Sequence, residues 1–434
     1  MSLTRRRFLQ ASTLAATSPL WATHRGVSAA PRAAQGGTLT AWGFTGGGVT
    51  EGMQSQVDAF KQKHPDVTVD VQTFPYADVH TNLLNAIVSG TGAPDLCSID
   101  AFYLTQYTDG LVDQSAHRAE YEDQFVPPTL DVGSYQGELY GLAGDAEPIG
   151  LFYRQDLWDQ YGIKEDDVKT WADLADAGNK LNTDSKGEAY LYGLFANDHY
   201  LYEVLANQQG FGGYYFDDTD TKVIVDDPKM VEAVGVIKQL WESKGALQNP
   251  GGTDIYSDEM TVDLKSGKVI SQLIGAGWYP STLTQNMPEL SGKWRLMRDP
   301  VLKEGDTLTG YQYPTILVMP TQSQNQDLAW QFAVAAMTGD GAKAMYDKYH
   351  ILPAFAPLLT ELGDQPDEYF GGQKTFQISD EIARDAPKVF FGTGFQEAQQ
   401  IFGAHLPNIL SGAKSVEDGL HEAAEEMRQK LNKS

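Results

Sequence analysis

The stretch TLTAWGFTGGGVTEGMQSQVDAFKQKHPDVTVDV, residues 38–71, shows two hydrophobic periods in succession. Residues 38–42 read as a strand, whereas apolar residues recur at helical spacing between Val49 and Phe60. The helix is expected to stop at Pro65, and residues 67–71 alternate again as a second strand. Strand, helix and strand with short connections predict an α/β fold with a parallel sheet.

The next segment repeats this pattern. Asp78 is placed to cap a second helix that closes at Gly90, and DLCSI, residues 95–99, has the continuous apolar character of a buried strand. Ligands of such sheets bind beyond the carboxyl ends of the strands. The loops GFTGGG (43–48) and DAFY (100–103) are therefore candidate binding loops.

Further helices have readable ends. Thr170 and Asp173 form a capping-box pattern, and a helix is expected to start at Asp227 and to end at Gly245. Ser415 is expected to cap a final amphipathic helix. The length of 434 residues suggests more than one domain. Because no low-complexity linker separates two domains, we expect the chain to cross between them more than once.

The N-terminus has the organisation of an export signal. Arg5, Arg6 and Arg7 precede a short apolar run, and small residues near Ala29 offer a cleavage point. The pattern resembles a twin-arginine signal, which implies export of a folded protein. We expect residues 1–29 to be removed and the mature protein to be soluble and periplasmic or extracellular. The segment near the signal contains no cysteine that could carry a lipid anchor. The single cysteine, Cys97, is expected to be a buried apolar residue.

Composition and motifs argue against several function classes. A formal net charge of -26 disfavours nucleic acid and anionic membranes as partners. The sequence lacks the GxSxG, HExxH and phosphate-loop patterns, and its eight histidines lack ligand spacing. The segment DDTDTKVIVDD, residues 217–227, lacks the glycine and final glutamate of a calcium loop and predicts a solvated turn. We therefore expect no catalytic residues, no metal and no cofactor.

Aromatic residues are concentrated between Tyr190 and Phe216. Tyrosine combines an apolar face with a polar tip, which suits a sugar, although such rings also pack protein cores. Three further aromatic pairs stand in expected loops, where ligand contact and packing remain equally open. These pairs are Trp42 with Phe44, Trp278 with Tyr279, and Tyr311 with Tyr313.

Four segments together resemble family 1 of the extracellular solute-binding proteins, the carbohydrate-binding subunits of ABC importers that include maltose-binding protein. The resemblance covers nearly all of the mature chain. Individually the motifs are loose, but their order and spacing are specific. The segments are FKQKHPDVTVDVQ, SGTGAPDLCSIDAFYLTQYTDGLVDQ, GELYGLAGDAEPIGLFYRQDLWDQYGI with KTWADLADAGNKL, and GKVISQLIGAGWYPSTL with PTQSQNQDLAWQFAVAAM.

This resemblance implies a two-domain periplasmic-binding-protein fold of type II, with a mostly parallel sheet in each domain and the ligand in the cleft. Domain one would comprise residues 36–146 and 315–362, and domain two residues 147–314 and 363–434. Asp100 and Glu147 would accept hydrogen bonds from sugar hydroxyls, and aromatic rings would stack on the sugar. The candidate ligand-binding residues are Trp42, Phe44, Thr45, Asp100, Phe102, Glu147, Tyr200, Trp278, Tyr279, Tyr311 and Tyr313.

The implied partners are a di- or oligosaccharide and the permease subunits of a membrane transporter, with the binding protein as a monomer. Two alternatives stay open at this point. Paired carboxylates among aromatic rings also describe a glycan-active enzyme. An anionic solute such as a glycerophosphate ester is the other, although the candidate loops carry few cations.

Overall fold

A computed structural model describes residues 37–45, 49–126, 129–197, 199–249 and 257–434. Residues 36–434 form one compact unit. The expected export signal, residues 1–29, lies outside the described residues. No helix in the described ranges combines the length and the apolar character needed to cross a bilayer.

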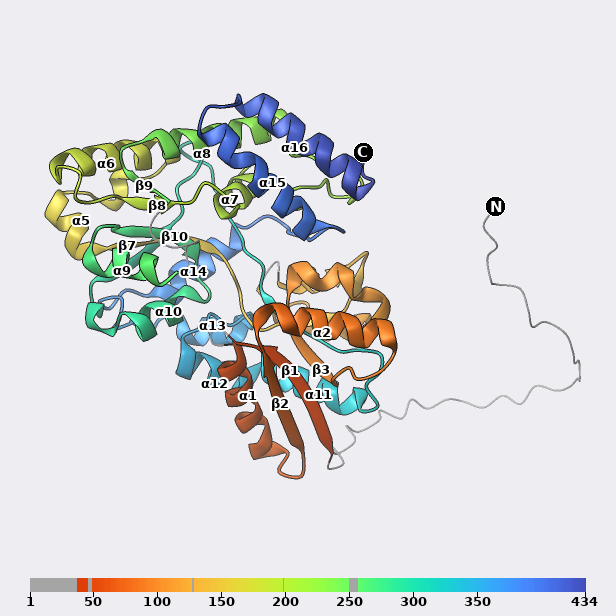
Figure 1. Ribbon diagram of the computed structural model, residues 1–434. Helices are drawn as coiled ribbons and strands as arrows, with labels where there is room; N and C mark the ends of the chain where they lie inside the picture. The colour runs from red at the N-terminus through yellow and green to blue at the C-terminus, as the bar shows by residue number, and fades with distance from the viewer. Residues whose placement is uncertain (1–36, 46–48, 127–128, 198, 250–256) are drawn as a thin grey trace, which may run out of the picture. The chain divides into compact units, whose positions relative to one another are not determined.

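A five-stranded sheet opens the fold, and its strands β1, β2 and β3, labelled in Figure 1, are the three that the sequence predicted. Its order is β2-β1-β3-β12-β6, in which β1 is parallel to β2 and β3, and β12 is antiparallel to β3 and β6. All strands except β12 therefore run in one direction. The strands are β1 (Thr38–Phe44), β2 (Thr68–Phe74), β3 (Leu96–Asp100), β6 (Gly141–Ala143) and β12 (Thr315–Val318).

Two helices connect the first three strands. The helix α1 (Val49–Lys63) packs against α11 (Gln326–Met337) and α12 (Gly339–Tyr349), which come from much later in the chain. The helix α2 (Tyr76–Ser89) ends at Gly90, whose φ of 74° lies in the left-handed region as expected. The prediction that Asp78 caps α2 is wrong, because the helix begins two residues earlier, after Pro75. Asp78 lies instead in the first turn, where its negative charge interacts favourably with the positive end of the helix dipole.

A second, three-stranded sheet has β7 (Ile149–Arg154) at its centre. Both neighbours, β10 (Ser271–Gly275) and β11 (Trp294–Arg298), pair with β7 in antiparallel register. The expectation of a mostly parallel sheet is therefore wrong for these strands, because β10 and β11 both run opposite to the central strand. A parallel pair, β8 (Tyr192–Leu194) with β9 (Ala246–Gln248), forms separately.

The later helices largely follow their sequence signals. Thr170 and Asp173 form the expected capping box, and the Ser415 hydroxyl accepts from the Asp418 N–H. The helix at Asp227 begins as expected but ends at Glu242, before Gly245. These helices are α5 (Gln155–Tyr161), α6 (Trp171–Asp184), α7 (Tyr200–Gln208), α8 (Pro228–Glu242), α9 (Asp258–Ser266), α10 (Tyr279–Asn286), α13 (Ala356–Leu362), α14 (Thr375–Arg384), α15 (Phe395–Leu410) and α16 (Val416–Leu431).

Short elements complete the described chain. The hairpin of β4 (Ser134–Tyr135) and β5 (Glu138–Leu139) precedes β6. The remaining short helices are η1 (Ala101–Gln106), η2 (Thr108–Gly110), η3 (Ser115–His117), α3 (Arg118–Tyr121), α4 (Thr129–Val132), η4 (Glu165–Asp167) and η5 (Pro288–Leu290).

The aromatic-rich segment 190–216 is largely core. Tyr202, Tyr214, Tyr215 and Phe216 are fully buried. The ring centroid of Phe402 on α15 lies 4.0 Å from that of Tyr202. Apolar packing therefore accounts for most of the aromatic density that the sequence shows in this segment.

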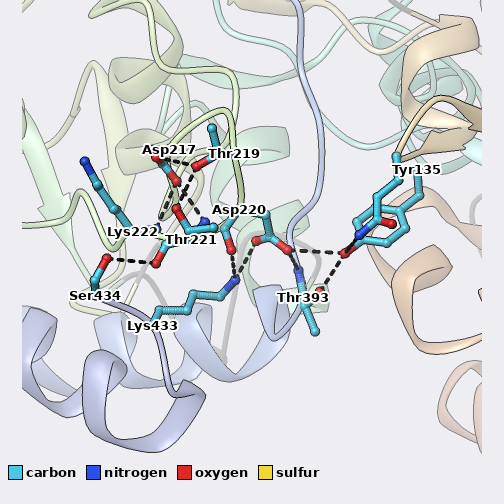
Figure 2. A network of polar contacts seen from close by, with 10 residues as sticks. Tyr135, Asp217, Thr219, Asp220, Thr221, Lys222, Thr393, Lys433 and Ser434 are labelled. Carbon is cyan, nitrogen blue, oxygen red and sulfur yellow. Dashed lines mark hydrogen bonds and ion pairs between the residues drawn. The ribbon is translucent and has the colours of Figure 1, made fainter.

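The acidic segment 217–227 forms a turn that holds the C-terminus (Figure 2). An Asp217 carboxylate oxygen accepts from the Thr221 and Lys222 N–H groups, both at 2.9 Å, which closes the turn. The Ser434 N–H donates to the Thr221 carbonyl at 2.9 Å. The carboxylates of this segment are thus engaged in local structure, in line with the predicted turn.

Candidate functional site

A cavity of about 830 Å³ lies where the carboxyl ends of β1 and β3 meet segments from later in the chain. Its volume is within the range of small-molecule sites. The wall comprises Phe44, Thr45, Met53, Gln56, Tyr76, Ser98, Asp100, Phe102, Tyr103, Gly144, Asp145, Glu147, His199, Tyr200, Trp278, Gln312, Tyr313, Thr315, Met337, Met345, Ile351, Gln396, Gln399 and Gln400.

Two extended segments form the centre of this wall and are bonded side by side. The Ile149 N–H donates to the Gly310 carbonyl at 3.0 Å, and the Gln312 N–H donates to the Glu147 carbonyl at 2.8 Å. Residues 144–149 link β6 to β7, and residues 310–315 lead into β12. The pair therefore connects the two sheets beside the cavity.

Asp100 ends β3 and faces the cavity. The Tyr76 hydroxyl donates to its Oδ2 at 2.5 Å, and the Thr315 hydroxyl lies 3.5 Å from Oδ1. Loss of solvation raises the pKa of Asp100 to about 7, with the nearby Asp145 charge adding to the shift against the two hydroxyl donors. Asp100 is therefore partly protonated near neutral pH.

Glu147 lies beside Asp145 and has no hydroxyl or N–H donor among the described residues. The residue is 2% exposed, and its hydrogen-bond contact is with the Asp145 carboxyl. Burial, together with the charges of Asp145 and Asp100, raises the pKa of Glu147 well above its usual value. The neighbouring Asp145 is also buried and has a raised pKa, although its Oδ1 accepts from the Thr315 N–H at 2.9 Å.

The glycines before Trp278 bring this acid close to the backbone. A Cβ at Gly275 would lie 2.6 Å from Glu147 Oε2, and one at Gly277 would lie 2.7 Å from Oε1. Only glycine fits at these distances. The GAG sequence at 275–277 thus allows Trp278 and Glu147 to share one part of the wall.

Aromatic rings supply flat surfaces on several sides. The Trp278 indole N–H donates to Gln312 Oε1 at 3.4 Å, which orients its ring. The rings of Tyr200 and Tyr313 are stacked with centroids 6.1 Å apart. Tyr313 also meets Phe102 edge to face at 4.6 Å. Such rings provide apolar faces for the C–H patches of a sugar.

The rest of the wall is apolar or uncharged. Met53, Met337, Met345 and Ile351 form an apolar part of the wall. No lysine or arginine occurs among the described lining residues. His199 lines the cavity, and burial lowers its pKa to about 4, so it is neutral at pH 7. The described wall therefore carries acids without a compensating cation.

The structure places eight of the sequence-predicted site residues on this wall. Most follow strands β1 and β3 or lie on the linking segments, as the loop argument required. The eight are Phe44, Thr45, Asp100, Phe102, Glu147, Tyr200, Trp278 and Tyr313.

Three predicted residues lie elsewhere. Trp42 borders a separate surface groove with Phe74 and donates its indole N–H to Gln72, because it lies two residues before Phe44 and so farther from the carboxyl end of β1. Tyr279 is buried against Phe152 with centroids 5.3 Å apart. Tyr311 is fully buried and does not line the cavity, although its neighbours Gln312 and Tyr313 do. For these three positions the packing interpretation holds.

Other lining residues were not among the named candidates. Tyr76 and Tyr103 sit beside Asp100, and Tyr103 belongs to the predicted binding loop at residues 100–103. The glutamines Gln396, Gln399 and Gln400 come from α15, far along the chain. Asp145 had a local signal, because it lies two residues before Glu147 in an extended segment and so shares its side of the chain. No local pattern marks the glutamines or Gln312.

Comparison with known proteins places the chain among relatives. A family model described as bacterial extracellular solute-binding protein matches residues 46–344, which is more than half of the chain. An arabinooligosaccharide-binding protein of Bacillus subtilis (strain 168) is 27% identical over 412 residues, covering 90% of this chain and 92% of that protein. A lactose-binding protein of Rhizobium radiobacter is 25% identical over 402 residues, covering 89% and 93%.

Solved structures share the fold. A transporter-associated binding protein from B. animalis subsp. lactis, in complex with beta-1,6-galactobiose, has a TM-score of 0.75 at 21% identity, covering 91% of this chain and 97% of that one. The sugar-binding protein MalE from Xanthomonas citri has a TM-score of 0.75 at 18% identity, covering 91% and 98%. The predicted two-domain α/β binding-protein fold is thereby confirmed.

Proposed function

Because the chain belongs to the bacterial extracellular solute-binding proteins, we propose that it is the substrate-binding subunit of an ABC importer for a di- or oligosaccharide. The observation that supports this most is the cavity itself, which combines ring faces with acceptors for hydroxyl groups. The names of the two relatives point to oligosaccharides as well. Delivery to membrane permease subunits and export through residues 1–29 are parts of the same proposal.

The binding mode follows from the wall. Asp100 and Glu147 accept hydrogen bonds from sugar hydroxyls, and Trp278, Tyr200 and Tyr313 contact the ring faces. Each charge-assisted hydrogen bond contributes about 1.5 to 3 kcal/mol. We propose that residues 36–146 with 315–362 and residues 147–314 with 363–434 form the two domains, which close about the segments 144–149 and 310–315.

Binding without reaction is the second half of the proposal. It is supported by the family, which is described as solute-binding, and by the relatives, which are named as binding proteins. An anionic solute is disfavoured, because the described wall offers no lysine or arginine.

A thermal-shift and calorimetry screen tests this function. Arabino-oligosaccharides, lactose, galactobiose and maltotriose are each added to the mature protein, and the mixtures are afterwards analysed by chromatography. Saturable binding with intact sugar supports the proposal. Appearance of shorter products would establish an enzyme instead, and binding of glycerophosphate esters alone would establish the anionic-solute alternative.

A further inference from the structure

The described wall of the cavity carries acidic side chains but no basic side chain that is charged at neutral pH. Asp100, Asp145 and Glu147 lie on the wall, whereas the other titratable lining groups are His199 and the tyrosines. His199 is neutral near pH 7 because burial lowers its pKa to about 4. The hydroxyl of Tyr76 is already committed to Asp100. No protein cation among the described lining residues offsets the three acids.

Glu147 is the residue that points to a ligand. Buried polar atoms in native proteins nearly always have hydrogen-bond partners, but neither oxygen of this side chain accepts from a hydroxyl or N–H donor of the described residues. Its hydrogen-bond contact is with the Asp145 carboxyl, which requires a proton held between the two acids. A sugar hydroxyl would supply the missing donor. It would not supply a positive charge, which is what would allow the three buried acids to ionise together.

The arrangement of these acids does not match a metal-binding site. Among the described residues, no group of three His, Cys, Asp or Glu side chains is arranged to hold a metal. An ammonium group has less strict demands, because its three N–H donors can be shared between carboxylates that are not arranged as ligands. The faces of Trp278 and Tyr200 on the same wall would also favour a cation.

We propose that the preferred ligand is an amino sugar, an oligosaccharide with at least one free protonated amine, which is seated against Glu147, Asp145 and Asp100. This inference rests on the proposed function and names the class of sugar. A neutral oligosaccharide would occupy the same cavity more weakly, because it can form hydrogen bonds with the acids but offers the carboxylates no opposite charge.

Proton release is a signature specific to this proposal. In the ligand-free protein, the raised pKa values of Asp100, Asp145 and Glu147 keep protons on the cluster near neutral pH. An ammonium beside the cluster favours the charged carboxylates and lowers their pKa values. Binding of an amino sugar therefore releases protons to the buffer, whereas binding of a neutral sugar does not.

Titration calorimetry tests the proposal with matched ligands. The probes are β-1,4-linked glucosamine di- and trisaccharides, the N-acetylated and glucose oligomers of the same linkage, and the 2-amino-2-deoxy derivative of the best neutral sugar from the screen. Each is titrated at pH 6.0, where the amines are already protonated, in phosphate and in Bis-Tris, whose different ionisation enthalpies report proton release. We expect a free-amine ligand to bind about tenfold tighter than its neutral counterpart, with proton release.

Variants separate the acid cluster from general effects. Glu147→Gln keeps the shape of the side chain and should reduce the amine preference to less than about threefold. Asp145→Asn, which retains the oxygen that accepts from Thr315, provides a second variant should the first fold poorly. The control Asp364→Asn removes an exposed acid outside the cavity and should leave the preference intact.

The possible outcomes discriminate between the two proposals. Neutral sugars that bind as tightly as their amines, without proton release, would overturn the amino-sugar inference and leave the proposed function standing. A protein that binds none of these sugars would overturn both. An amine preference that survives Glu147→Gln and Asp145→Asn would remove the acid cluster as its cause.

Discussion

The polar network around Asp220, drawn in Figure 2, and the cavity around Glu147 hold carboxylates in opposite conditions. Asp220 Oδ1 lies 2.6 Å from the Lys433 ammonium, and its Oδ2 accepts from the Thr393 N–H at 2.9 Å and from the Tyr135 hydroxyl at 3.4 Å. Glu147 accepts no hydrogen bond from a hydroxyl or N–H donor of the described residues. Both acids are withdrawn from solvent, with side-chain exposure of 16% for Asp220 and residue exposure of 2% for Glu147.

This difference is the one expected if Asp220 is structural and Glu147 binds the proposed sugar. Lys433 is 7% exposed and packs over the Phe216 ring at 4.3 Å, so its pairing with Asp220 ties the end of the chain to the fold. A buried acid that lacks hydroxyl and N–H donors costs stability in the free protein, and under the proposed function a ligand would supply those donors.

The largest effect is expected from breaking the satisfied network. Asp220→Ala leaves the Lys433 ammonium nearly buried and unpaired, which should lower the free energy of unfolding by about 3 kcal/mol. Urea denaturation measures the loss. Sugar affinity should stay within about twofold, because the network lies outside the cavity wall.

The matched control for this variant is Asp340→Ala. Asp340 pairs with Lys63 at 2.6 Å, but the two side chains are 67% and 70% exposed. Exposed pairs contribute about 0 to 1 kcal/mol. Equal destabilisation by the two variants would show that burial of the Asp220 pair carries no special weight.

The second effect concerns binding rather than stability. Trp278→Ala removes a ring from the cavity wall and should weaken sugar binding by about 2 kcal/mol, close to 30-fold. The thermal transition of the ligand-free protein should change little. Calorimetric titration of the best sugar measures the loss, and unchanged affinity would remove Trp278 from the binding surface.

A smaller effect is expected from pH on the free energy of unfolding. The pKa of Asp100 is raised in the folded protein from 3.8 to about 7, so between these values the folded state binds more protons than the unfolded state. The contribution of this group to stability is therefore complete below about pH 4 and is lost as pH rises through 7. The free energy of unfolding should fall over this window in the ligand-free protein.

Asp100→Asn tests the assignment of that slope, since it removes the titrating group and should flatten the fall in unfolding free energy. Asp299 is also buried with a pKa raised to about 6, although Thr309 and Gln208 donate to it. Some slope should therefore remain in the variant. A profile identical to that of the unmodified protein would show that Asp100 does not titrate in this range.

The smallest effect should come from Trp42→Ala. Trp42 packs on Phe74 at 5.1 Å and lines a groove separate from the cavity. Sugar affinity should not change, and the free energy of unfolding should fall by about 1 kcal/mol at most. A clear loss of affinity in calorimetric titration would return Trp42 to the site and contradict its placement.

The candidate site could be predicted in part because some of its residues follow strands. Asp100 and Phe102 come directly after β3, and Phe44 and Thr45 lie at the end of β1, so the topology alone directs them to one edge of the sheet. Glu147 and Trp278 were located through a family resemblance. The error at Tyr279 has a local cause, because adjacent residues at the start of a helix point in different directions.

What the sequence determined by itself is the succession of strands and helices at the start of the chain, together with most of the helix ends. Hydrophobic period and capping groups act over a few residues, so a single chain segment carries the information. The tertiary structure alone decided which acids have partners. Asp220 meets Lys433 across the length of the C-terminal half, and Glu147 lies against Gly275 and Gly277. Those contacts join residues more than a hundred positions apart, and their energetics depend on burial that no local pattern encodes.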